Sequence, residues 1–229
     1  MPSLEEKCAA TRGLLEALLT RHDPSRIAVA WTGGKDSTVV LHLWREVVAG
    51  NAACAGQSGI RVFAVNLDTG YKFPEILTFR DRMASAWDVT LHVIRPESAD
   101  IPVVAAEDHM ACCRALKITP LRRAVERLGI TALLTGVRAD ENPSRTDLAE
   151  LEGREGYVQV NPILAWTEMD VWAYTMARGL PYCALYDQGY RSLGCMPCTK
   201  KAAPDQAERA GRDQEKEARM AELHALGYF

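Results

Sequence analysis

The feature that most constrains the fold is a glycine-rich turn between a short apolar segment and a helical one. Residues 27–31 (IAVAW) have the length and composition of a buried strand, and residues 38–48 have those of a helix. The turn between them consists of Thr32, Gly33, Gly34, Lys35, Asp36 and Ser37. Two glycines let the backbone bend sharply and bring N–H groups close to an anion. The order strand, glycine loop, helix therefore predicts a phosphate-binding loop, although its spacing is not that of the Walker motif.

The same alternation of strands and helices continues along the chain. Apolar strand-like and helical segments follow each other at residues 60–67, 74–87, 90–94, 114–128 and 132–136. Strands that alternate with helices of about 10 to 15 residues favour parallel βαβ units, whose ligands bind at the carboxyl ends of the strands. The sequence therefore predicts an α/β fold with a doubly wound, mainly parallel sheet. Asp68, Thr69 and Gly70 end the second strand, where they would form a second wall of a nucleotide site.

The chain is long enough for one such domain. The 229 residues, 48% of them hydrophobic and 25% charged, are typical of a globular protein. We expect a single domain over residues 1–200, with an N-terminal helix at 4–20 and a core at 26–200. Residues 201–229 are expected to form a charged C-terminal tail that is helical or mobile.

The last third of the chain has a different pattern. Residues 157–160 (YVQV) read as a short edge strand, and residues 167–177 begin with Thr167, a good N-cap, followed by acidic residues. Charge is dense and aromatic residues are absent over residues 200–222. Such a run is usually a solvated helix or a mobile tail.

Charge and hydropathy exclude several classes of function. Lys and Arg number 27 and Asp and Glu 30, a net charge of −3 that gives no basis for bulk nucleic-acid binding. No apolar run reaches the length of about 20 residues that a membrane span needs. Residues 1–6 (MPSLEE) lack the features of a secretory signal, so we expect a cytoplasmic protein. The sequence leaves open whether the chain forms a homo-oligomer.

Four of the seven cysteines form two tight pairs, Cys112-Cys113 and Cys195-Met196-Pro197-Cys198. In a reducing compartment such pairs indicate metal or redox chemistry rather than structural disulfides. Four thiolates are what a cubane iron–sulfur cluster requires. Zinc also binds four thiolates, but an adjacent Cys-Cys pair fits its usual ligand spacing poorly. A redox dithiol is the third reading, whereas the remaining thiols, Cys8, Cys54 and Cys183, are expected to be packing or surface residues.

The flanking residues resemble those of a known family. The loop Trp31–Ser37 resembles the SGGKDS signature of the PP-loop superfamily. Residues 112–121 (CCRALKITPL) and 189–199 (GYRSLGCMPCT) resemble the two cysteine segments of assimilatory adenylyl-sulfate (APS) reductases. Residues 161–182 are similar to the NPL…W…DVW…LPY stretch of the same family. The resemblance runs in the same motif order from about residue 27 to about residue 212.

This resemblance implies a PP-loop fold of the adenine nucleotide alpha hydrolase-like type, with a [4Fe-4S] cluster. The implied cluster ligands are Cys112, Cys113, Cys195 and Cys198. Lys117 would lie beside the cluster and help to hold an anionic substrate, while Arg114 is as well read as a surface residue. Arg138 and Arg145, in a loop after the fourth strand, suit forked contacts to phosphate or sulfate. The segment around them also resembles the adenylylating subunit of ATP sulfurylase, a sister family that lacks the two cysteine pairs.

One implied element is missing from the tail. The reductases carry a nucleophilic cysteine near the C-terminus in a Glu-Cys-Gly-Leu-His type motif, but residues 213–229 contain no cysteine, and Ala221-Glu222-Leu223-His224 stand about where the motif is expected. Either Cys8, Cys54 or Cys183 substitutes, or an external thiol attacks the bound substrate directly. A third reading is a divergent member that uses the cluster and the loop for another adenylyl or sulfur transfer.

The resemblance thus implies an iron–sulfur oxidoreductase of sulfate assimilation that reduces APS, or the 3′-phosphorylated PAPS, to sulfite and AMP or PAP. Branches with the cluster commonly prefer APS, and the electron donor would be thioredoxin or a small thiol. One alternative is an ATP-dependent adenylyl- or sulfurtransferase that carries the cluster. Another is a nucleotide-binding partner subunit without activity of its own.

Overall fold

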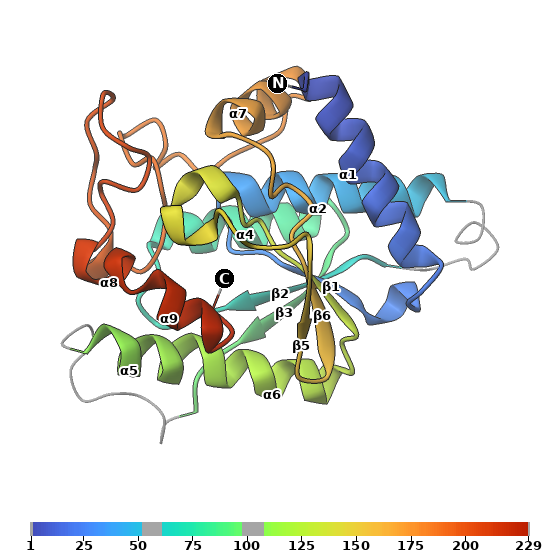
Figure 1. Cartoon of the computed structure of the whole chain (residues 1–229), viewed down its shortest axis with the longest axis horizontal. Coiled ribbons are helices and arrows are strands. Elements are labelled where there is room, and N and C mark those ends of the chain that lie inside the picture. The colour runs from blue at the N-terminus through green and yellow to red at the C-terminus, as the bar shows by residue number, and fades with distance from the viewer. Residues whose placement is uncertain (1, 52–60, 98–107, 229) are drawn as a thin grey trace.

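A six-stranded sheet forms the centre of the molecule (Figure 1). The structure is a computed structural model that describes residues 2–51, 61–97 and 108–228. The strands are β1 (Ile27–Ala30), β2 (Phe63–Leu67), β3 (Thr90–Ile94), β4 (Ala132–Leu134), β5 (Leu151–Arg154) and β6 (Tyr157–Val160). Their order is β3-β2-β1-β4-β6-β5, and every neighbouring pair is parallel except β5 with β6. The predicted doubly wound, mainly parallel sheet is confirmed.

The strand order places a topological switch point between β1 and β4. From β1 the chain moves outward through β2 to β3 and then returns to the other side of β1 as β4. Ala28 of β1 pairs with Phe63 of β2 on one side and with Leu133 of β4 on the other. Loops that leave the carboxyl ends of β1 and β4 therefore diverge and leave a crevice, which is where ligands bind in such sheets.

The expected edge strand at 157–160 is internal instead. β6 pairs in parallel with β4, and β5 covers its other side as an antiparallel neighbour. Residues 151–154 are charged and contain a glycine, so their composition does not suggest a strand. They form one because Gly156, with φ of +84°, turns the chain into a hairpin, and the charged residues suit an edge strand.

Helices cover both faces of the sheet (Figure 1). Their bounds are α1 (Leu4–Leu19), α2 (Lys35–Gly50), α4 (Pro74–Ala86), α5 (His109–Cys113), α6 (Thr119–Leu128), α7 (Glu168–Ala177), α8 (Gln214–Ala218) and α9 (Met220–Ala225). A π-helical turn, Arg114–Ile118, joins α5 to α6. None of the helices in the described ranges has the length and apolarity that crossing a bilayer requires.

The apolar core divides at the sheet. Side chains alternate along each strand, so Ile27 and Val29 pack with α1, α2, α4 and α7, while Ala28 and Ala30 pack with α6. α7 starts at the Thr167 capping box, in which the Thr167 hydroxyl accepts from the Asp170 N–H. Packing of helices on both faces of the sheet fixes the strand ends that carry the candidate site.

The C-terminal segment lies against the carboxyl ends of the strands (Figure 1). α8 and α9 are short, and Met220, Leu223 and Tyr228 form a small buried cluster with Cys113 and Ile118. The sequence predicted a charged tail that is helical or mobile; residues 214–225 form two short helices, and one side of them is buried. The apolar side chains of this segment lie on one side and pack against α5 and the π-helical turn.

Candidate functional site

A cavity opens at the switch point of the sheet, with about 1070 Å³ of space that is partly open to solvent. Three groups of residues line it: Thr32, Gly34, Asp36 and Ser37 of the glycine loop, Gly136 and Val137 after β4, and Arg209, Arg212 and Tyr228 of the C-terminal segment. The sequence placed the first group there. The third comes from the part of the chain that was expected to be a charged tail.

The glycine loop has the geometry of an anion-binding turn. Gly33 adopts φ of +81°, and α2 begins at Lys35 with Gly34 as its N-cap, which makes no side-chain cap hydrogen bond. The Ser37 hydroxyl accepts from the Thr32 N–H at 3.2 Å and donates to the Gly34 carbonyl at 3.1 Å. The helix N-terminus, with its positive dipole end, therefore faces the cavity from a fixed turn.

The loop after β4 touches the glycine loop at Gly136. A Cβ atom on Gly136 would lie 2.7 Å from the Ser37 backbone nitrogen and 3.0 Å from the Asp36 carbonyl carbon. Those neighbours are backbone atoms, so nothing flexible could move away. Glycine is required at position 136 because the loop after β4 and the start of α2 approach each other so closely.

The two cations nearest the loop are engaged by carboxylates. Lys35 contacts Asp36 and Glu208, and Arg138 donates to Asp36 at 2.7 Å, to Asp140 at 2.5 Å and to Glu208. Burial raises the pKa of Glu208 above its usual value. The sequence predicted that Arg138 would contact an anionic ligand. In the structure its guanidinium instead contacts carboxylates of the same chain.

A second set of buried charges adjoins the first. Glu141 contacts Arg145 and accepts from Arg209 at 3.3 Å, and Arg209 also forms two hydrogen bonds with Glu217 at 2.7 and 2.8 Å. Burial would raise the pKa of Glu141, but Arg145 and Arg209 outweigh it and lower the pKa to about 2. Carboxylate oxygens of Asp36, Glu141 and Glu208 lie within 4.8 Å of one another. Because Lys and Arg side chains face all three, this cluster is an ion-pair network.

The four paired cysteines line a second, smaller cavity, which shares Lys117 with the larger cavity at the glycine loop. Cys112 and Cys113 come from α5, whereas Cys195 precedes the helical turn Met196–Cys198 and Cys198 ends it. Backbone contacts fix this turn, since the Met196 N–H donates to the Tyr71 carbonyl at 2.7 Å and Lys72 pairs antiparallel with Cys195. The structure thus brings together thiols that are more than 80 positions apart in the chain.

The surroundings of this cavity are cationic. Lys117 and Lys216 line it together with the cysteines. Burial opposes ionisation of the Cys195 thiol, but Lys117, Lys72 and a contact of 3.2 Å with the Thr69 hydroxyl outweigh it and lower its pKa to about 6. Anionic sulfur in a cationic pocket is what four thiolate ligands of an iron–sulfur cluster or zinc require.

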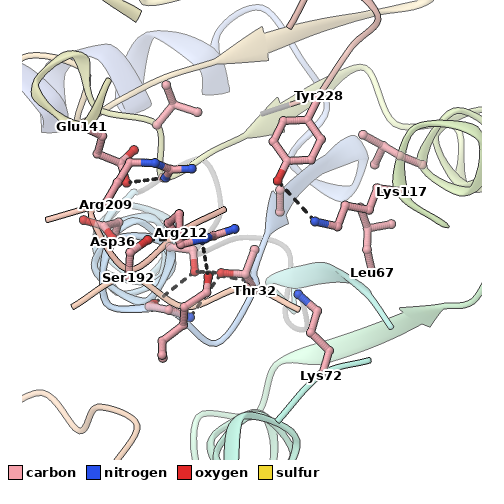
Figure 2. Close-up of a pocket in the computed structure, with 18 of the residues that line it drawn as sticks. Thr32, Asp36, Leu67, Lys72, Lys117, Glu141, Ser192, Arg209, Arg212 and Tyr228 are labelled. Atoms are coloured by element: carbon pink, nitrogen blue, oxygen red, sulfur yellow. Dashed lines mark hydrogen bonds and ion pairs between the residues drawn. The ribbon is translucent and has the colours of Figure 1, made fainter. Parts of the chain in front are cut away.

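Lys117 connects the two cavities. It lines both, and its ammonium donates to the Tyr228 hydroxyl at 3.3 Å (Figure 2). Lys216 donates to the same oxygen at 2.9 Å. Burial would raise the pKa of Tyr228, but the two ammonium groups lower it to about 7. Burial disfavours the charged form of Lys117, but the Cys195 thiolate and Tyr228 more than compensate and raise its pKa.

Other predicted residues lie elsewhere around the site. Asp68 and Gly70 form a turn in which the Asp68 carboxylate accepts from the Gly70 N–H at 3.1 Å, and Thr69 contacts Cys195. None of these three is among the described residues that line the larger cavity; Leu67 and Lys72 are there instead. Arg114 is exposed.

The cavity wall also contains residues that were not predicted as site residues, among them Lys72, Arg212 and Tyr228. Arg212 donates to the Ser192 hydroxyl at 3.2 Å and to the Leu193 carbonyl at 3.1 Å, and its buried Nε has no hydrogen-bond partner among the described residues. The segment Glu208–Arg212 carried a usable signal, since its resemblance to the family extends to Arg212. Lys72 and Tyr228 carried none.

The remaining cysteines lie away from the site. Cys183 is buried in the larger core, in agreement with its reading as a packing residue, and Cys8 is partly buried against the same core. Cys54 lies outside the described residues.

Comparison with known proteins shows consistent likenesses. The family model for the phosphoadenosine phosphosulfate reductase domain matches residues 26–201. An adenosine 5′-phosphosulfate reductase of Deinococcus radiodurans is 38% identical over 164 residues, which are 69% of this chain and 64% of that protein. Another, from Neisseria meningitidis serogroup B, is 33% identical over 92% of this chain and 85% of that protein. A phosphoadenylyl-sulfate reductase crystal structure from Candida auris superposes with a TM-score of 0.58 at 22% identity, covering 88% of this chain and 98% of that one.

Proposed function

The chain belongs to the phosphoadenosine phosphosulfate reductase family, of the PP-loop superfamily, and from this premise we propose that it reduces an adenylyl sulfate to sulfite and AMP. The observation that carries the proposal is the position of Lys117, which lines both the cavity at the glycine loop and the cavity of the four cysteines. A nucleotide whose phosphate lies at the loop can thereby extend its sulfonate towards the cysteine site. We favour APS as the substrate because the relative from Neisseria meningitidis serogroup B, which matches 92% of this chain, is named an adenosine 5′-phosphosulfate reductase.

Binding of the phosphosulfate falls to the glycine loop and the arginines. The N–H groups at the start of α2, together with the hydroxyls of Thr32 and Ser37, would donate to the α-phosphate. Arg212 lines the same cavity, and its buried Nε has no hydrogen-bond partner among the described residues. Arg138 and Arg145 both contact carboxylates, although Arg145 also lines the larger cavity, so we assign them to positioning Asp36 and Glu141.

A [4Fe-4S] cluster fits the cysteine site. Cys112, Cys113, Cys195 and Cys198 would hold it, since all four line one cavity and nearby lysines lower the pKa of Cys195. Once bound, it would supply a polarisable charge next to Lys117 and tie the two cysteine segments together. Lys117 and Lys216 offset the negative charge of four thiolates from two sides of this cavity.

The reaction needs a thiol at the sulfonate. A thiolate attacks the sulfonate sulfur, an S–S bond forms, the S–O bond to the phosphate breaks, and AMP leaves. A second thiolate then attacks the inner sulfur of this S-sulfonate, so that a disulfide forms and sulfite leaves with the electron pair. None of the described residues that line the larger cavity is a cysteine. We therefore propose that a thioredoxin or a small thiol supplies both thiolates.

The test is sulfite release from APS by anaerobically purified protein, with thioredoxin or a small thiol as donor. We expect stoichiometric sulfite and AMP at enzymatic rates, and about four iron atoms and four sulfides per chain. Cys183→Ala is the control, because this core thiol should be dispensable. Absence of sulfite from protein that holds its cluster and binds APS would contradict the reductase proposal. About one zinc and no sulfide would contradict the cluster.

A further inference from the structure

Lys72 is a charged residue of the cavity that the reaction described above leaves unused. It lies four residues beyond Asp68, and its backbone pairs antiparallel with Cys195. Its side chain lines the larger cavity, and Figure 2 shows its ammonium group pointing towards the same space as that of Lys117, below the Tyr228 ring. The pairing with Cys195 fixes the base of this side chain beside the cysteine turn.

The other cations of the cavity wall have partners within the chain. Arg145 and Arg209 contact Glu141, Arg212 donates to Ser192, and Lys117 donates to Tyr228. Within the described ranges, the Lys72 ammonium makes no hydrogen bond or ion pair. Lys72 is partly buried, and its charge interacts with Cys195 and Tyr228, but neither is hydrogen-bonded to it, so its donors are available to an anionic ligand.

The two ends of the cavity differ in charge. At the glycine-loop end, Asp36, Glu141 and Glu208 compensate the cations. At the opposite end, the Lys72 and Lys117 ammonium groups point towards the same space, and Tyr228 accepts from Lys117 (Figure 2). A ligand with two linked anionic groups can therefore place one at the start of α2 and the other between the lysines. Ammonium groups are compact point charges that suit a tetrahedral oxyanion.

We propose that Lys72 binds the terminal sulfonate of the substrate together with Lys117, and that it makes the site prefer an adenylyl sulfate over AMP. This inference rests on the proposed function, because it takes the substrate class from there. It assigns the preference to a lysine on the loop after β2, outside the glycine loop and outside both cysteine segments. AMP lacks the sulfonate, so its binding should depend little on Lys72.

The experiment measures binding of APS and of AMP by calorimetry to the cluster-loaded protein and to Lys72→Met and Lys72→Arg variants. We expect Lys72→Met to weaken APS binding about 10- to 100-fold, the range for a lost charged hydrogen bond, and to change AMP binding less than about threefold. Lys72→Arg should restore most of the APS affinity. Lys201→Met, at an exposed lysine beside Tyr190, is the matched control and should leave both affinities unchanged.

Iron content and thermal midpoint are measured on each variant to separate binding from damage. Equal weakening of APS and AMP in Lys72→Met, or no weakening of either, would overturn the inference, as would a wild-type protein that does not prefer APS to AMP. Sulfite release is scored separately. A wild-type protein that prefers APS through Lys72 but releases no sulfite would contradict the proposed function and leave the assignment of Lys72 standing.

Discussion

Arg138 illustrates how a residue's partners change its role. A guanidinium in a loop after a strand of a nucleotide-binding sheet suggests a ligand contact. Its side chain is fully buried, and the carboxylates of Asp36, Asp140 and Glu208 occupy its donors. Such a pair loses several kcal/mol when only one partner is removed, because the other charge stays buried without compensation. Arg138 is therefore better described as part of the scaffold of the glycine loop.

Glu141 supplies a prediction at this scale. Its ordinary pKa of 4.5 falls to about 2 in the folded protein, mainly because Arg145 and Arg209 outweigh the effect of burial. A depressed carboxyl pKa stabilises the fold above the unfolded value, and this contribution is lost as the pH falls through the folded value. In Glu141→Gln we expect a loss of about 3 kcal/mol at pH 7, measured by urea unfolding, and a smaller loss at pH 3.

The control for Glu141 is Glu16→Gln, at an exposed position of α1, whose stability should match that of the wild type at both pH values. A difference between wild type and Glu141→Gln that stays constant from pH 7 to pH 3 would show that the ionised carboxylate is not what the arginines stabilise.

At the scale of elements, the close contact between the β4 loop and the start of α2 shapes the binding site. Gly136→Ala would place a methyl group 2.7 Å from the Ser37 backbone nitrogen, so the two segments must separate. We expect a loss of about 1 to 3 kcal/mol in stability and at least tenfold weaker binding of APS and AMP alike, measured by urea unfolding and calorimetry.

Gly153 offers the matched control for this substitution. It lies on β5, and a Cβ atom there would meet nothing within 4 Å. Gly153→Ala should therefore leave nucleotide binding unchanged. Unaltered binding in Gly136→Ala would mean that the glycine loop tolerates displacement from β4.

The helix that carries the adjacent cysteines is also less regular than its sequence suggests. One helix over residues 114–128 was predicted, and the structure has α5, a π-helical turn over Arg114–Ile118 and α6. Single π-helical turns are frequent at functional sites. Here the turn carries Lys117, which lines the cysteine cavity and the larger cavity.

At the scale of the whole molecule, the C-terminal segment joins parts of the site that the sheet alone would leave separate. Lys216 of α8 lines the cysteine cavity, the Asp213 N–H donates to the Cys198 carbonyl at 3.2 Å, and Tyr228 meets Lys117. The two larger apolar clusters, in contrast, contain no residue beyond position 193.

Deletion of residues 213–229 should therefore leave the sheet folded but weaken the proposed cluster site. We expect an unchanged far-ultraviolet circular dichroism spectrum apart from the lost helices, and loss of iron to a chelator about tenfold faster, the scale of a lost outer-shell contact. Glu222→Ala, on the exposed side of α9, is the control. Iron loss at the wild-type rate would mean that the tail does not support the cysteine cavity.

The family, the doubly wound sheet and the glycine loop could be predicted from the sequence. They depend on periodicity and on short motifs whose residues are neighbours in the chain. The cysteine pairs stay a prediction as cluster ligands, although the fold does bring them to one cavity. Which charged side chains line the cavity, and which of them are paired within the chain, could be read only from the tertiary structure. Glu208 meets Lys35 across 173 positions and Tyr228 meets Lys117 across 111. Contacts over such separations depend on how the helices pack on the sheet, which local sequence does not encode.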